Sequence, residues 1–291
     1  MSNTNALLYV YGVFDTGNPS SWPAVPGYIS DILASDFNVV VFSTFHVDAL
    51  GNLFGSVPLV TDGQFNPTNQ LDPDLPQYYQ QLAQAGRTLY YSIGNSAGTA
   101  GDMANLALIL ADPTGAAYAN LQANLKVLAE VLTIAGIDFD FEPADYGSTE
   151  QTIVTDFTTF CTGLKLQVTY CPYAVESWWI DAQIAAVQAG GAVQWWNLQC
   201  YAGGFGNSPA TWLPSIQQNA GALGVADPPT FIVPGVDTSG GPAAVQAEIQ
   251  SFASGAPGLN AAFLWQLGDI ENQGGATVAQ YATAVLQGLS G

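Results

Sequence analysis

The stretch AGIDFDFEP, residues 135–143, carries the pattern from which the fold can be inferred. Side chains alternate along a β-strand, so the acidic residues would share one face and the apolar residues the other. The acidic set is Asp138, Asp140 and Glu142, and the apolar set is Ile137, Phe139 and Phe141. A solvated edge strand could carry this alternation, but the Ile and Phe residues favour burial. In a barrel, the apolar set would face surrounding helices and the acidic set would line the interior.

Three stacked carboxyl groups are costly inside a protein, because burial and like charge both oppose their ionisation. We call Asp138, Asp140 and Glu142 the acidic column and expect its members to share protons. At least one of them should keep its proton well above the usual carboxyl pKa. A purely structural barrel offers no reason for such a column, so the pattern indicates a functional site.

Eight β-rich runs recur through the chain, and segments with helical spacing separate them. The runs are residues 7–13, 39–45, 88–93, 137–141, 166–171, 195–200, 230–233 and 261–265. The clearest helical segments are residues 118–134, 149–164, 177–189, 242–254 and 277–289. Regular alternation of strand and helix predicts an α/β protein with a parallel sheet, which eight units can close into a (β/α)8 TIM barrel. A doubly wound open sheet is the alternative.

Two long loops follow the first two expected strands. They cover residues 15–26 and 46–76, are rich in Gly, Pro, Asn and Asp, and lie at the strand ends where barrel enzymes build their sites. No linker, charge run or shift in composition divides the 291 residues. We therefore expect a single domain over residues 1–291, a length that suits an α/β barrel.

The charge balance narrows the range of partners. The chain has 23 acidic residues against three basic ones, Arg87, Lys126 and Lys165, and a net charge of −20. Such a chain repels phosphate backbones and anionic headgroups, so we expect neither nucleic acid nor a membrane as partner. A neutral or cationic glycan is compatible, although the acidity could serve solubility alone. No signal peptide or transmembrane stretch is evident, which predicts a cytoplasmic protein, or a secreted one if a leader preceded Met1.

Cysteine and histidine are too few for most metal or nucleophilic sites. Cys161, Cys171 and Cys200 are odd in number and include no CxxC pair, so we expect no metal and favour buried free thiols over a Cys171–Cys200 bridge. His46 is the single histidine, and no nucleophile elbow accompanies it, which disfavours a Ser-His-Asp hydrolase. A structural role for His46 is favoured over contact with a ligand.

The acidic stretch resembles the DxxDxDxE signature of glycoside hydrolase family 18, which contains chitinases and endo-β-N-acetylglucosaminidases. The match ends at Glu142, but Ala135 stands where the signature has its first Asp. Three further stretches are similar to family motifs and follow the family's order, namely SIGN at residues 92–95, NLQCY at residues 197–201 and FLWQ at residues 263–266. Each ends an expected strand, so the resemblance spans most of the chain.

The resemblance implies hydrolysis of β-1,4 linkages between N-acetylglucosamine units, as in chitin, with retention of configuration and without cofactor or metal. It assigns Glu142 as the general acid that protonates the leaving oxygen. The acetamido oxygen of the substrate itself would attack the anomeric carbon. Asp140 would orient the acetamido N–H, Tyr201 would bind the acetyl oxygen, and Asp138 would share a proton with Asp140.

The resemblance also suggests which residues touch the substrate. Trp265 would stack on the sugar at the cleavage point, and the other expected contacts are Gln199, Tyr11 and Ser92. The partner would be a glycan that contains N-acetylglucosamine, and the protein a monomer. Two alternatives stay open: a glycan-binding protein with weak or no turnover, which Ala135 favours, and an endo-β-N-acetylglucosaminidase that acts on N-glycans. The retained acid, Glu142, favours an enzyme.

Overall fold

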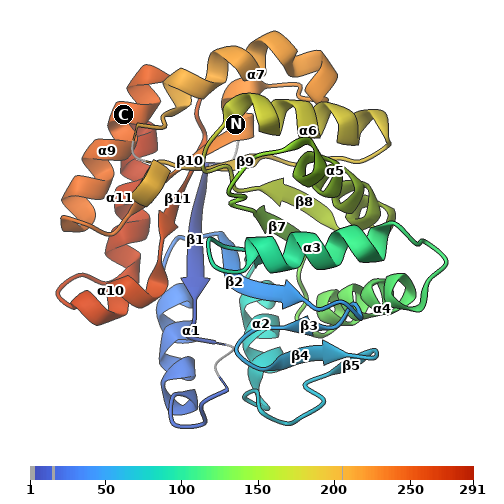
Figure 1. Cartoon of the computed structure of the whole chain (residues 1–291). Helices are drawn as coiled ribbons and strands as arrows, with labels where there is room; N and C mark the ends of the chain where they lie inside the picture. The colour runs from blue at the N-terminus through green and yellow to red at the C-terminus, as the bar shows by residue number, and fades with distance from the viewer. Residues whose placement is uncertain (1–3, 15–16, 205) are drawn as a thin grey trace.

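The strands of the central sheet run parallel and close on themselves. The computed structural model describes residues 4–14, 17–204 and 206–291. The barrel has eight strands, β1 (Asn5–Tyr11), β2 (Val39–Val47), β6 (Thr88–Gly94), β7 (Gly136–Asp140), β8 (Gln167–Tyr170), β9 (Trp196–Gln199), β10 (Ile232–Asp237) and β11 (Ala261–Trp265). β1 pairs with both β2 and β11, which closes the ring (Figure 1). The predicted single-domain (β/α)8 TIM barrel is confirmed.

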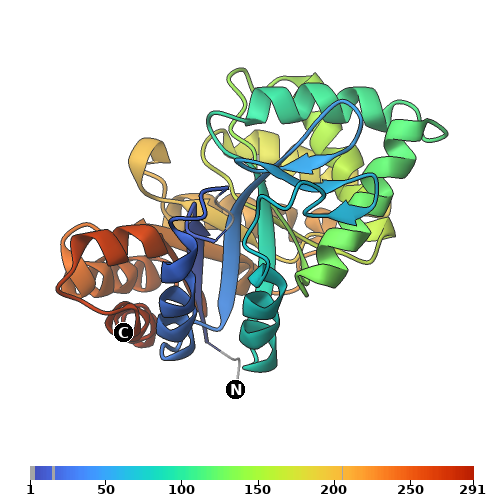
Figure 2. The ribbon, with the colours of Figure 1, turned by 90° about the horizontal axis from the view of Figure 1, so that it is seen from below.

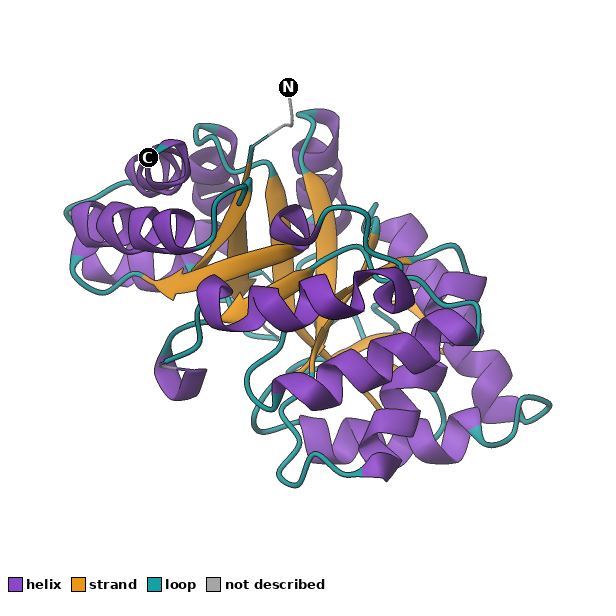
Figure 3. Cartoon of the chain, turned by 90° about the horizontal axis from the view of Figure 1, so that it is seen from above, coloured by secondary structure: helices purple, strands orange, loops and turns teal. Residues whose placement is uncertain are grey.

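Helices surround the strands on the outside of the barrel (Figure 3). They are α1 (Val25–Leu33), α2 (Leu75–Gln84), α3 (Thr99–Leu110), α4 (Ala116–Val131), α5 (Ser148–Gly163), α6 (Glu176–Gln188), α7 (Pro209–Leu223), α8 (Pro228–Phe231), α9 (Gly241–Gly255), α10 (Leu267–Gln273) and α11 (Val278–Ser290), with short 3₁₀ turns η1 (Trp22–Ala24) and η2 (Ala202–Gly204). The helical segments predicted from spacing correspond to α4, α5, α6, α9 and α11. Their ends differ from the predicted ones by a few residues, which is usual for helix termini.

The segment of residues 46–76, expected to be a loop, contains three short antiparallel strands. They are β3 (Leu53–Phe54), β4 (Pro58–Thr61) and β5 (Gln64–Phe65), and they lie beside α4 at one side of the barrel (Figure 2). The chain turns between β4 and β5 at Asp62 and Gly63, whose φ angles of 49° and 73° suit a two-residue hairpin turn. Of the other expected loop, residues 15 and 16 lie outside the described residues.

Alternate strand residues divide the apolar core into two layers. Outward side chains pack against the helices, and Phe139 of β7 stacks on Phe157 of α5 with ring centroids 4.9 Å apart. Inward side chains fill the barrel itself: Leu7, Tyr9, Val39, Val41, Tyr90, Cys171, Tyr201, Val233, Ala261 and Phe263. Asp138 and Asp140 are buried on this inner side, as the alternation along the strand predicted. The barrel interior is therefore packed rather than open.

The cysteines behave as small apolar side chains. Cys161, Cys171 and Cys200 are all buried and free, so no Cys171–Cys200 bridge forms. Burial raises the pKa of the Cys200 thiol to about 12, which keeps it uncharged. Among the described residues, no group of three or more His, Cys, Asp or Glu side chains could hold a metal ion. Within the same residues, no helix has both the length and the apolar character needed to cross a membrane.

Candidate active site

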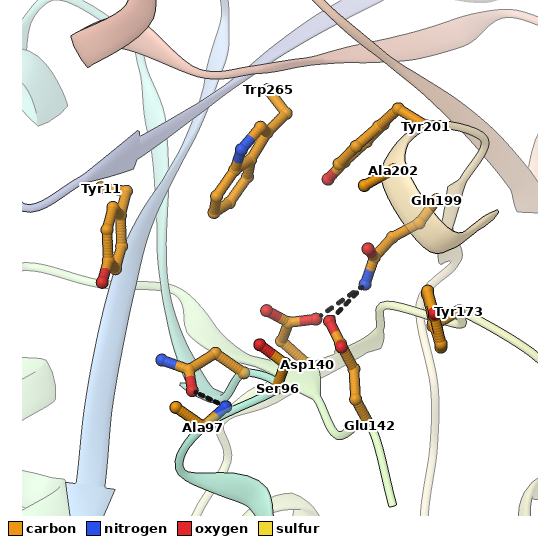
Figure 4. A pocket seen from close by; sticks show the side chains of 11 residues that line it. Tyr11, Ser96, Ala97, Asp140, Glu142, Tyr173, Gln199, Tyr201, Ala202 and Trp265 are labelled. Atoms are coloured by element: carbon orange, nitrogen blue, oxygen red, sulfur yellow. Dashed lines mark hydrogen bonds between the residues drawn. The ribbon is translucent and has the colours of Figure 1, made fainter. Parts of the chain in front are cut away.

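A cavity of about 460 Å³ opens where the barrel strands end. Its walls come from residues that end or follow β1, β6, β7, β8, β9 and β11, so it lies on the face where barrel enzymes carry their sites. Figure 4 shows the side chains that surround it. They are Tyr11, Asn95, Ser96, Ala97, Asp140, Glu142, Tyr173, Gln199, Tyr201, Ala202 and Trp265.

Asp138 lies below the cavity and is completely buried. Its carboxylate accepts three hydrogen bonds, from the Tyr9 hydroxyl at 2.8 Å, Thr169 Oγ1 at 2.6 Å and Asn197 Nδ2 at 2.9 Å. These bonds favour the charged form, but burial outweighs them and raises the pKa of Asp138 from 3.8 to about 6. At neutral pH, Asp138 is therefore a carboxylate that three uncharged donors stabilise.

Asp140 and Glu142 reach the cavity and share one hydrogen-bond donor. Gln199 Nε2 donates to Asp140 Oδ1 over 2.9 Å and to Glu142 Oε1 over 3.3 Å, as the dashed lines in Figure 4 show. Burial raises the pKa of Asp140 well above its usual value, and the charges of Glu142 and Asp138 raise it further. Burial also raises the pKa of Glu142, whereas the bond from Gln199 lowers it. Both carboxyl groups therefore keep a proton to higher pH than a solvent-exposed carboxyl group does.

The members of the acidic column influence one another through charge. In the described part of the chain, no hydrogen bond joins the carboxyl groups of Asp138 and Asp140. The negative charge of Asp138 instead raises the pKa of Asp140. Burial is the main cause of the raised pKa of Asp140, and the charges of Glu142 and Asp138 add to it, so proton sharing between Asp138 and Asp140 stays a prediction.

The loop between β6 and α3 holds the backbone that carries Glu142. Thr99 Oγ1 accepts a hydrogen bond from the Glu142 N–H at 3.0 Å and donates one to the Asn95 carbonyl at 2.6 Å. The Asn95 N–H in turn donates to the Asp140 carbonyl over 2.7 Å. Gly94 has a φ of 111°, and a Cβ there would lie 2.3 Å from the Asp140 carbonyl oxygen. This close approach between β6 and β7 therefore requires glycine.

Aromatic side chains form the wall that faces the carboxyl groups (Figure 4). The rings of Tyr201 and Trp265 are stacked, with centroids 6.1 Å apart and planes at 17°. The Tyr11 ring lies 5.9 Å from that of Trp265 and is 46% exposed. Burial raises the pKa of Tyr201 well above its usual value, so its hydroxyl keeps its hydrogen and can donate it to a ligand. The cavity combines apolar ring faces with a few placed polar groups, as small-molecule sites do.

The cavity brings together most of the residues expected at the site, but Ser92 and Asp138 do not line it. Asp138 supports the cavity from below. Ser92 is fully buried beside Asp138 in the sheet, and its Oγ donates to Ser43 Oγ over 3.1 Å. The expectation that Ser92 touches a substrate is therefore corrected, because β6 directs this side chain into the barrel interior. Ala135 packs against the inner apolar cluster.

Sequence reasoning missed Tyr173, which lines the cavity, and the donors to the deepest carboxylate. These donors are Tyr9, Thr169 and Asn197. Two of them could have been found from the strand period, since Tyr9 lies two residues before Tyr11 and Asn197 two before Gln199. Tyr173 follows β8 in a loop that carries no comparable sequence pattern.

The closed barrel, with its acid-bearing cavity at the strand ends, has a glycoside hydrolase-like fold. This fold is the one found in glycoside hydrolase family 18 chitinases, so the fold that the sequence motifs implied is confirmed. One such chitinase, from Pseudoalteromonas aurantia, has a TM-score of 0.64 and 13% sequence identity, with 98% of this chain and 100% of that chain covered. The chitinase from the chitin utilization locus of Flavobacterium johnsoniae has a TM-score of 0.64 and 11% identity, with coverages of 98% and 94%.

The same fold occurs in a spore cortex-lytic enzyme. The spore cortex-lytic enzyme SleL of Bacillus cereus is similar to this chain with a TM-score of 0.61 and 14% identity, covering 98% of this chain and 74% of that chain. No protein-family model and no curated protein matches the sequence. At these identities the similarity establishes the fold, and the chemistry has to be argued from the site.

Proposed function

We propose that this protein hydrolyses β-1,4 linkages between N-acetylglucosamine units by substrate-assisted, retaining catalysis. The observation that carries the proposal is that the side chains needed for this chemistry line one cavity. Asp140, Glu142 and Tyr201 face it together with the Trp265 ring. Gln199 donates a hydrogen bond to each of the two carboxyl groups. The similarity in fold to chitinases, enzymes that act on a polymer of this sugar, supports the same conclusion.

Glu142 is the general acid in this proposal. A general acid must hold a proton near neutral pH and lie within reach of the leaving oxygen. The raised pKa of Glu142 supports the first requirement, because burial favours the protonated carboxyl. Its half-buried position on the cavity wall supports the second. After the bond breaks, the same group, now a carboxylate, takes a proton from the water that hydrolyses the intermediate.

The nucleophile is the acetamido oxygen of the substrate, which bonds to the anomeric carbon while the leaving oxygen takes the proton of Glu142. Asp140 accepts a hydrogen bond from the acetamido N–H of the substrate. Its carboxyl group lies close to that of Glu142, because Gln199 donates a hydrogen bond to both. The Tyr201 hydroxyl, which keeps its hydrogen, donates to the acetyl oxygen. The Trp265 ring then supplies the apolar surface under the sugar.

A glycan-binding protein without turnover is the second candidate, because Ala135 replaces an acid of the family signature. Ala135 packs among apolar side chains of the barrel interior. The charge of Asp138 is stabilised instead by Tyr9, Thr169 and Asn197. These donors lower the pKa of Asp138 against the larger effect of burial. The chain also retains Glu142, the acid that hydrolysis needs, which favours hydrolysis over binding alone.

Turnover of a fluorogenic chitobioside tests the proposal. Glu142→Gln should lower kcat by roughly 10²- to 10⁴-fold, because an amide cannot supply the proton. Glu130→Gln is the matched control, since Glu130 lies exposed on α4 and outside the cavity. Chitooligosaccharide binding without turnover by the unmodified protein would favour the second candidate. A Glu142→Gln protein as active as its parent would contradict the role of Glu142.

The anomer that forms first tests the mechanism. Retention predicts that the β-anomer of the product appears before mutarotation, which proton NMR can follow in real time. Initial release of the α-anomer would contradict attack by the acetamido oxygen. A chitooligosaccharide and an N-glycan core should be compared in the same assay, and we expect cleavage of the chitooligosaccharide. Light scattering would check the expected monomer.

A further inference from the structure

A second cavity adjoins the active-site cavity at the ends of β1 and β2. This second cavity has a volume of about 290 Å³ and shares Tyr11 and Asn95 with the first. The remaining wall includes His46, at the end of β2, and Ser56, between β3 and β4. Tyr11 and Asn95 therefore belong to the wall of both cavities, which makes the two neighbours on one face of the barrel. We call the second cavity the His46 cavity.

The ring of His46 is held on two sides. Its Nδ1 lies 2.8 Å from Oδ2 of Asp102, a residue of α3 that is 2% exposed, and the other oxygen of Asp102 accepts the Val47 N–H at 2.9 Å. An ionised carboxylate can only accept hydrogen bonds, so Nδ1 carries the hydrogen. A Cβ on Gly98 would lie 2.1 Å from Cε1 of His46, which shows that the loop before α3 packs directly on the ring.

This fixed ring leaves one polar atom for a ligand. His46 lines the cavity with 19% of its side chain exposed, and Nδ1 is already bonded to Asp102. Nε2 is then the atom that can bond to a ligand, as an acceptor in the neutral ring. Burying the Asp102 carboxylate costs free energy, and packing alone does not need it. Its bond to Nδ1 fixes the orientation of a His46 ring that remains partly exposed to the cavity.

The surroundings of His46 suit an uncharged sugar. The Phe54 ring packs near the His46 ring, with centroids 5.6 Å apart, and the exposed Tyr11 ring lines the cavity. Arg87 directly precedes β6 and Lys165 lies two residues before β8, so both lie on the barrel face opposite the cleft, and Lys126 lies on α4. An anionic ligand would meet none of these cations. Ring faces with a few hydrogen-bonding atoms instead match the faces and hydroxyls of a pyranose.

The position of Glu142 gives the direction of the bound chain. Figure 4 shows Tyr11 at one end of the active-site cavity and Tyr173 at the other, with Glu142 toward Tyr173. The leaving group must lie next to Glu142, and the sugar that undergoes attack lies at Trp265. Units on the non-reducing side therefore continue past Tyr11 and into the His46 cavity.

We propose that His46, oriented by Asp102, binds an uncharged sugar unit on the non-reducing side of the cleavage point and so sets a preference for longer oligosaccharides. The inference rests on the proposed function, because it takes the cleft to hold a glycan. The ligand donates a hydroxyl or acetamido hydrogen to Nε2 of His46, while the Tyr11 ring covers an apolar face of the sugar.

Because His46 is the single histidine of the chain, its ring nitrogens can be observed alone. We would label the Glu142→Gln protein with ¹⁵N-histidine, remove any histidine tag and titrate it with chitooligosaccharides from the disaccharide to the pentasaccharide. We expect the Nε2 resonance to shift with the longer oligosaccharides and to saturate together with the change in tryptophan fluorescence. An Nε2 resonance that stays in place while the fluorescence saturates would overturn the inference.

Variants give a second measurement, with turnover as the readout. We expect His46→Ala to reduce the ratio of kcat/KM for a fluorogenic trisaccharide to that for the disaccharide by about tenfold, the usual size of a lost hydrogen bond with its ring contact. His46→Gln, which keeps an acceptor, should restore part of the ratio. An unchanged ratio would overturn the inference and leave the proposed function intact. Binding with an Nε2 shift but no turnover would overturn hydrolysis and leave the role of His46 intact.

Discussion

At the scale of single residues, Gln199 influences the acidity of Glu142. Its Nε2 donates to both Asp140 and Glu142, and its bond to Glu142 opposes the effect of burial on the pKa. Gln199→Met removes the donor at similar volume, so the pKa of Glu142 should rise further. We expect the alkaline limb of the kcat/KM profile to move to higher pH, with about tenfold lower kcat/KM at the optimum. A limb that moves to lower pH would contradict this role.

Asp138 makes the stability of the protein depend on pH. Its pKa is raised from 3.8 to about 6, so the folded state holds the proton more tightly than the unfolded chain does. The resulting stabilisation is fully present below about pH 4 and is lost as the pH rises through about 6. Asp138→Asn stays uncharged, so it should increase the free energy of unfolding above about pH 7 by on the order of 3 kcal/mol, with little change near pH 4.

Urea unfolding at about pH 4 and about pH 8 measures this difference between the two proteins. An asparagine can keep the bonds from Thr169 and Asn197 on its oxygen, while its amide donates to the Tyr9 hydroxyl. If Asp138→Asn increased the free energy of unfolding equally at both pH values, then packing rather than ionisation would explain the difference between the two proteins. That result would contradict the predicted cost of the buried charge.

The residues of the acidic column could be predicted because a single strand determines them. Alternation along one strand places Asp138 and Asp140 inward, whatever the neighbouring strands do. Thr169, a donor to Asp138, could not be predicted in the same way, since no expected site residue lies on its strand and the sequence does not define the register of that strand. Ser92 was misplaced for a related reason, because its depth along the barrel axis decides whether it reaches the cavity.

At the scale of elements, the first residue of α3 positions the backbone of Glu142, the proposed general acid. Thr99 is 1% exposed and accepts the Glu142 N–H through Oγ1. Thr99→Val keeps the shape but leaves this N–H without its partner, which costs about 1–3 kcal/mol for a buried group. We expect kcat to fall about tenfold while KM changes less than about twofold, because a shifted Glu142 affects proton transfer more than binding.

The matched control is Thr283→Val on α11, where an exposed threonine donates only to the Ala279 carbonyl of its own helix. Steady-state kinetics and thermal unfolding of both variants separate the two effects. The control should leave kcat unchanged. If both variants lose activity equally, or if the loss for Thr99→Val appears entirely in KM, the positioning role is wrong.

The regular elements were easier to predict than the segments between them. Each barrel strand is a short apolar run between helical segments, and burial on both sides makes that signal strong. The β3–β5 group was read as a loop because its strands are short and polar turns separate them. Its Asp62-Gly63 turn is nevertheless a hairpin signal, so the information was present but was outweighed by the high content of Gly, Pro and Asn.

At the scale of the whole molecule, the charge distribution should select among glycans. The net charge is −20, and the three basic residues lie away from the cleft. We expect the affinity for a neutral chitooligosaccharide to change less than about twofold between low salt and about 0.3 M salt. A glycan whose alternate sugars carry carboxylates should bind at least about tenfold more weakly at low salt. Calorimetry with both ligands measures this, and equal affinities would contradict it.

The apolar filling of the barrel also decides how hydrogen ions travel. Leu7, Val39, Val233 and Ala261 are buried in the barrel interior, and none of these side chains can carry a hydrogen ion. Asp140 and Glu142 line the cavity, so they exchange hydrogen ions with bulk water most directly through the mouth of the cleft. A sugar chain that lies across the mouth restricts this route. Exchange of hydrogen ions between these two carboxyl groups and the medium should then be slower with a glycan bound than without one.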